Sequence, residues 1–215
     1  MQNSFESKFS AMIRKRNAKS YTDKIARFKF LSLFIIGFIS GCLVFSGFSN
    51  KALSPYYTYI SKHLQDIISM RGEFSLLLFE VIKISKTDLY HLFFVFIAGF
   101  TYFCFPVTGD IVFTKGFMFG YSLFFIKHLP NDIVLNSKVA FTVIFFMIKL
   151  IIGIITASQA AETYIFSYDF KLIKQNCSIL RRSPATYKFA FLFLKSLGGC
   201  LLLNLIYCIL IKLLI

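Results

Sequence analysis

The sequence predicts an all-α membrane protein: a polytopic bundle of about five transmembrane helices, with an amphipathic helix on the extracytoplasmic side. Three observations predict this class. Hydrophobic residues make up 57% of the chain and aromatic residues 19%, which exceeds the apolar share of an ordinary soluble domain. Several apolar runs are long enough to cross about 30 Å of hydrocarbon. Lys and Arg number 24 against 10 Asp and Glu, and they flank the apolar runs, as is typical beside anionic cytoplasmic headgroups.

Residues 1–29 form a basic arm, and residues 30–215 have the length of a single membrane domain. The arm carries eight basic residues against Glu6 and Asp23. We expect it to lie in the cytoplasm against membrane lipids. We do not expect it to bind nucleic acid, which requires a coherent basic face. The first span, about 30–48, is uncharged and exceeds the apolar core of a signal peptide, about 7–15 residues, which favours an uncleaved anchor.

The outer segment, residues 49–88, contains a helical pattern of apolar residues. They recur at steps of three, four or seven, which places them on one helix face. Two interpretations remain open: a helix resting on the membrane or the bundle, and a docking face for an extracytoplasmic partner. The candidate docking residues are Ile60, Leu64, Ile67, Phe74, Leu78 and Val81.

Four further spans are predicted, at about 89–109, 111–126, 139–158 and 189–211. The 111–126 run is short and contains Lys115, so a re-entrant hairpin competes with a full crossing. The loop at 159–188 is basic, and about twice as many basic residues fall on the proposed inner side as on the outer side. Loop charge therefore predicts a multi-pass cell-membrane protein with a cytoplasmic N-terminus and an extracytoplasmic C-terminus.

Small residues at four-residue spacing predict close helix packing. Gly37 and Gly41 form one such pair, and Gly116 and Gly120 form another. Glycine at this spacing lets helix backbones approach closely in lipid. These residues, with the stripe of the fourth span, serve packing either inside one subunit or in contacts with another copy in a homo-oligomer or with a partner protein. The stripe comprises Gly153, Ala157 and Ala161.

Lys149 is the one residue that interrupts the fourth span with a charge. An ionised side chain at that depth needs a protein, water or acid partner. Structural pairing, with Asp110 as the best available acid, is one interpretation. A proton or solute path is the other.

The sequence predicts no enzyme activity, no cofactor and no metal site. The spans contain no paired carboxylates, Walker loop, HExxH helix or GxSxG elbow. His63, His91 and His128 lie far apart and lack Cys, Asp or Glu at metal-ligand spacing. The cysteines form no disulfide framework or CxxC pattern. Any catalysis is therefore expected from a partner.

The stretch from Ile97 to Tyr121, IAGFTYFCFPVTGDIVFTKGFMFGY, resembles the central hairpin of the stage II sporulation protein M family. A glycine ends an apolar run, followed by a proline, a Lys-Gly pair, and a second glycine with an aromatic neighbour. The order of basic arm, span, outer helix, hairpin, fourth span, inner loop and last span is also similar. The motif residues are Gly99, Pro106, Lys115, Gly116, Gly120 and Tyr121.

The resemblance implies a non-catalytic scaffold. In that family the membrane protein anchors peptidoglycan-remodelling hydrolases, of lytic transglycosylase and amidase type, during forespore engulfment in sporulation. The helix at about 59–84 would then be the docking surface. The alternative function is a small permease or exporter subunit that moves an ion or solute past Lys149. A third hypothesis is a helper of membrane-protein assembly.

Overall fold

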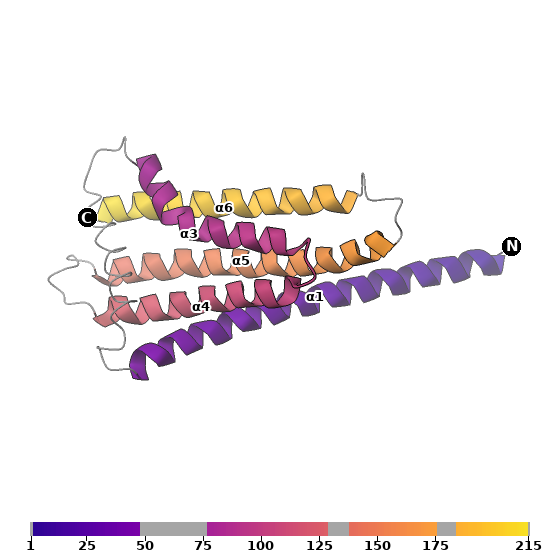
Figure 1. Ribbon diagram of the computed structural model, residues 1–215, viewed down its shortest axis with the longest axis horizontal. Coiled ribbons are helices and arrows are strands. Elements are labelled where there is room, and N and C mark those ends of the chain that lie inside the picture. The colour runs from indigo at the N-terminus through magenta and orange to yellow at the C-terminus, as the bar shows by residue number, and fades with distance from the viewer. Residues whose placement is uncertain (1, 48–76, 129–137, 176–183, 215) are drawn as a thin grey trace.

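The computed structural model describes residues 2–47, 77–128, 138–175 and 184–214, and these residues are helical except for a turn at 99–103. The helices are α1 (Gln2–Gly47), α3 (Leu77–Ala98), α4 (Cys104–His128), α5 (Lys138–Gln175) and α6 (Pro184–Leu214). They lie roughly along one direction as a bundle, with the N-terminal half of α1 projecting beyond it (Figure 1). The predicted all-α bundle is confirmed for the part of the chain that the structure describes.

Three helices are long and apolar enough to cross a membrane. Their spans are Asp23–Ser46 in α1, Thr142–Tyr168 in α5 and Thr186–Ile211 in α6. Such helices satisfy their backbone hydrogen bonds internally, which hydrocarbon requires. The chain is therefore a membrane protein of the helical-bundle class, while the number of crossings beyond these three stays a prediction.

The hairpin differs from the predicted pair of spans. A continuous span over 89–109 is wrong, because α3 ends at Ala98 and α4 begins at Cys104. In the turn, the amides of Gly99 and Phe100 donate to carbonyl oxygens three residues earlier, at 3.1 and 3.0 Å. Pro106 lies in the first turn of α4, where a missing backbone N–H costs nothing.

Helix α3 also begins well before residue 89. Buried residues, both apolar and polar, recur along one face of this helix at steps of three or four residues. They are Val81, then Ile84 and Ser85, then Asp88. The predicted outer segment ends at Asp88, which is 3% exposed. The burial of Asp88 against other helices instead keeps it inside α3.

The predicted inner loop at 159–188 is largely helical. Helix α5 continues to Gln175, and α6 begins at Pro184. The extension keeps one side of α5 buried, because Ala160, Ala161 and Phe166 are all less than 7% exposed. Packing on this face outweighs the polar composition that indicated a loop.

Helices α1 and α4 pack backbone to backbone through their glycines. A Cβ on Gly37 or Gly41 would collide with the carbonyl oxygen of Phe113 or Phe117 in α4. A Cβ on Gly116 or Gly120 would collide with the carbonyl oxygen of Phe34 or Phe38 in α1. The two glycine pairs therefore interlock within one chain, which is the intramolecular alternative predicted for them.

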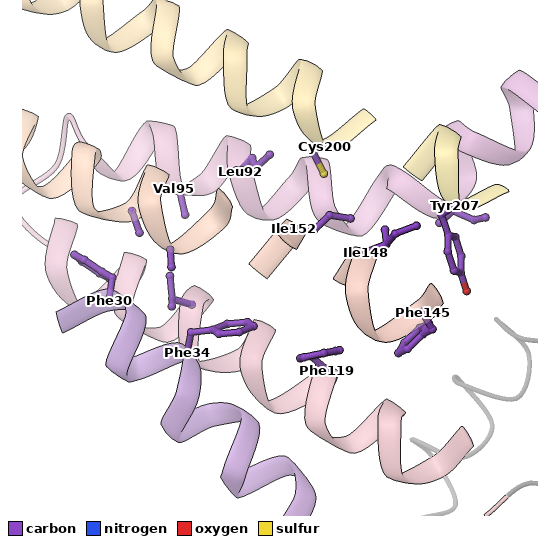
Figure 2. Close-up of a cluster of buried hydrophobic side chains, with 14 of the residues drawn as sticks. Phe30, Phe34, Leu92, Val95, Phe119, Phe145, Ile148, Ile152, Cys200 and Tyr207 are labelled. Carbon is purple, nitrogen blue, oxygen red and sulfur yellow. The ribbon is translucent and has the colours of Figure 1, made fainter. Parts of the chain in front are cut away.

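Aromatic and aliphatic side chains fill the space between the helices (Figure 2). Phe34 of α1 stacks on Phe119 of α4 with ring centroids 6.2 Å apart. Near the turn at 99–103, Phe166 of α5 stacks on Phe189 of α6 at 4.2 Å. Gly99 lies against this second group, where an added Cβ would stand 3.2 Å from Phe189 Cζ. This core holds the polar residues described below in fixed positions.

Candidate functional site: a charged cluster inside the bundle

Four helices each place one polar side chain at a common point inside the bundle. They are Asp88 of α3, Lys115 of α4, Lys149 of α5 and Asn204 of α6. We call these four residues the Asp88 cluster. Each lies in a helix that is fixed by apolar contacts on both sides of the polar residue. Buried Ile84 and Leu92 flank Asp88 on α3, and buried Ile148 and Ile152 flank Lys149 on α5.

Asp88 is the centre of the cluster. Its carboxylate accepts hydrogen bonds from Lys115 Nζ at Oδ1, from Lys149 Nζ at Oδ2 (3.3 Å), and from Asn204 Nδ2 at Oδ2 (3.1 Å). The Asp88 side chain is 4% exposed, and the lysine side chains are 13% and 17% exposed. A buried carboxylate with several charged or polar donors is stabilised as the anion, and removing its donors is costly.

Asn204 completes the connection between the two ion pairs. Its Oδ1 accepts from Lys149 Nζ at 3.4 Å, while its Nδ2 donates to Asp88. The ring of Tyr207, one turn further along α6, lies 5.8 Å from Lys149 Nζ and adds a cation–π contact. The cluster therefore cross-links α3, α4, α5 and α6 through side chains alone.

The cluster lies well inside the apolar part of the bundle. A second ion pair, from Arg27 Nη2 of α1 to Glu162 Oε1 of α5 at 2.6 Å, marks the basic end, with side chains 61% and 23% exposed. Lys149 lies thirteen residues from Glu162 along α5, or about 20 Å at 1.5 Å per residue. The cluster and the Arg27–Glu162 pair therefore lie at clearly different levels along the bundle.

Polar residues also line the buried side of α5 between the cluster and the basic end. Thr156, Gln159 and Thr163 are 0–2% exposed. Thr156 donates to its own helix, at the Ile152 carbonyl (2.9 Å), and Gln159 Oε1 accepts from Ser196 of α6 (2.9 Å). The hydrogen bond between Ser196 and Gln159 joins α5 to α6 between the cluster and the turn at 99–103.

Pairing of Lys149 was predicted from the sequence, but the predicted acid was wrong. Asp110 is exposed on α4, and Asp88 is the partner of Lys149. Sequence reasoning missed Asp88 because it was assigned to the end of the outer segment, 49–88, rather than to a helix of the bundle. It also missed Asn204, although an isolated Asn in an apolar run is a signal of a buried contact.

Five of the six hairpin residues of the family resemblance lie at packing positions, and the sixth, Pro106, is exposed in the first turn of α4. Gly99 forms the turn, Gly116 and Gly120 contact α1, Lys115 pairs with Asp88, and Tyr121 is 1% exposed. On α5, a Cβ on Gly153 would collide with the Phe34 ring. Ala157 and Ala161 are 3% and 0% exposed. The small-residue stripe therefore packs within the chain.

The candidate docking face is mostly outside the described residues. Ile60, Leu64, Ile67 and Phe74 fall there, and the side chain of Leu78 is also outside the description. Val81 is 5% exposed and belongs to the core. In this structure Val81 is therefore not available as a docking residue.

Within the described ranges, no three His, Cys, Asp or Glu side chains gather as a metal site would require. The chemistry that the cluster offers is that of a fixed charge pair, hydrogen bonding and ion binding. The fold and this intramembrane cluster define the class, a helical-bundle membrane protein with buried charges. Comparisons with protein-family models, curated proteins and solved structures find no match.

Proposed function

We propose that the chain is a non-catalytic membrane scaffold that anchors peptidoglycan-remodelling hydrolases. The observation that carries this proposal is the pairing of Lys149 with Asp88 and Asn204. A scaffold needs helices held in one arrangement, and a buried network that joins four helices does this. The interlocked glycines of α1 and α4 favour the same rigid role.

The partner class rests on the resemblance of the hairpin to the stage II sporulation protein M family. Gly99, Lys115, Gly116 and Gly120 all fix the hairpin against its neighbours, which supports treating them as one motif. We propose five crossings, a cytoplasmic N-terminus and wall hydrolases of lytic transglycosylase and amidase type on the opposite side, as in engulfment during sporulation.

Copurification from crosslinked membranes tests the scaffold. The full-length protein should retain hydrolases of the two named types. The variants Ile60→Glu and Leu64→Glu should lose them while keeping the wild-type melting temperature. Lys62→Gln, on another side of the same predicted helix, is the matched control and should retain them. A wild-type protein that retains neither hydrolase type contradicts the proposal.

A second candidate function is a permease subunit, because the buried lysines Lys115 and Lys149 are also compatible with an ion route. Ionisable groups at this depth are expensive, and they frequently mark ion or solute routes. Reconstitution in liposomes separates the two functions. A scaffold gives no solute or ion flux, whereas a permease gives flux that Lys149→Leu abolishes.

A further inference from the structure

The charges of the Asp88 cluster do not cancel among the described residues that form it. Lys115 and Lys149 both contact the one carboxylate of Asp88. Among the other groups that α3 and α6 place near it, the amide of Asn204 is uncharged, and Ser85, Cys200 and Tyr207 are uncharged with their protons in place. With Asp88 ionised and both lysines protonated, the site has one excess positive charge. In an apolar surrounding such a site attracts an anion, because little water competes there.

Two buried hydroxyl groups beside the cluster have no hydrogen-bond partner among the described protein groups. They are Ser85 Oγ of α3 and Tyr207 Oη of α6, and both residues are 0% exposed. A buried hydroxyl without an acceptor is costly. Two such groups, each about one helical turn from residues that hold two lysines on a single carboxylate, leave donors that a bound acceptor would satisfy.

The helix directions place both hydroxyl-bearing residues on the same side of the cluster. Ser85 precedes Asp88 by three residues, and Tyr207 follows Asn204 by three. Helices α3 and α6 run antiparallel (Figure 1). Since Asp88 and Asn204 are in contact, Ser85 and Tyr207 each lie about 4.5 Å further along the bundle in the same direction.

We propose that Ser85, Tyr207 and the ammonium groups of Lys115 and Lys149 form a binding site for a small monovalent anion of halide type. All four supply hydrogen-bond donors from four different helices, which suits a small anion. Asp88 and Asn204 act as positioning residues that hold the lysines. This inference goes beyond the scaffold function and does not depend on it.

Chloride is the probe for the test, with the full-length protein in detergent. The melting temperature is measured while chloride replaces gluconate at constant ionic strength and constant pH. The melting temperature of the wild type should rise by about 3–6 °C when the chloride concentration reaches about ten times the Kd for chloride, and should then keep rising with the logarithm of that concentration. Bromide should act as chloride does, and sulfate should have no such effect.

Two variants localise the site. Ser85→Ala and Tyr207→Phe remove buried hydroxyls that have no described protein partner, so the variants should fold, yet their response to chloride should weaken at least threefold. The control is Tyr187→Phe, at an exposed position of α6, the helix that carries Tyr207. This variant should respond to chloride as the wild type does. The proposal is overturned if the melting temperature of the wild type does not rise with the logarithm of the chloride concentration, or if both hydroxyl variants respond like Tyr187→Phe. A melting temperature that varies with pH but not with chloride also overturns it, in favour of proton loss from a lysine.

Discussion

The α1–α4 contact and the Asp88 cluster hold the same bundle by opposite means. In the first, glycines remove side chains so that backbone meets backbone. In the second, long polar side chains reach across from four helices to a single carboxylate. The comparison shows that apolar association in lipid depends on close fit, whereas the buried charges contribute through the cost of separating them. Mutations should therefore destabilise the two contacts for different reasons: a larger side chain disrupts the α1–α4 contact, whereas the loss of one charge leaves the others in the cluster without a partner.

The largest effect is expected from removing the shared carboxylate. Asp88→Leu leaves two lysines without their acid, which should cost about 3–5 kcal/mol of the free energy of unfolding. Unfolding in mixed detergent with rising SDS measures it. Asp110→Leu is the control, because Asp110 is exposed on α4, and it should change the midpoint little. If the two variants unfold at the same SDS concentration, Asp88 contributes no more to stability than the exposed Asp110, and this prediction is contradicted.

A smaller loss is expected at the glycine contact. Gly116→Ala places a methyl group against the carbonyl of Phe34, and separating the two backbones should cost about 1–3 kcal/mol. The control is Gly198→Ala on α6, where an added Cβ meets nothing within 4 Å. That variant should be neutral or stabilised by up to about 1 kcal/mol, because alanine favours a helix. The same SDS titration decides, and a neutral Gly116→Ala would contradict the interlocked packing.

The smallest effect is expected at the basic end. The pair between Arg27 and Glu162 has side chains 61% and 23% exposed, so solvent screens it. Arg27→Gln should cost no more than about 1 kcal/mol, and raised salt should reduce the difference from the wild type. A loss as large as that of Asp88→Leu would show that burial does not separate the two ion pairs as proposed.

The sequence predicted the glycine contact better than the charged cluster, for a physical reason. Gly37 with Gly41, and Gly116 with Gly120, are local patterns whose spacing alone indicates close packing. Asp88 and Asn204 are 116 residues apart in the chain, so no local spacing could pair them. The lysine of the fourth span needed a partner, and that need was predictable, but the identity of the partner was not.

Helix ends were predicted poorly where polar residues are buried. Asp88 indicated a span boundary, and Gln159 and Glu162 indicated a loop, yet all three lie inside helices. Each finds a partner on a neighbouring helix. Hydropathy measures the cost of a polar residue in lipid, and it does not include the contact that offsets this cost.

A double-mutant cycle between Asp88 and Lys149 tests the central claim most directly. The variants are Asp88→Leu, Lys149→Leu and the pair, with the free energy of unfolding measured by SDS titration. The two side chains contact each other, so the double variant should lose less than the sum of the single losses, with a coupling of about 1–3 kcal/mol. Losses that add within about 0.5 kcal/mol would contradict the claim that this buried pair holds the bundle together.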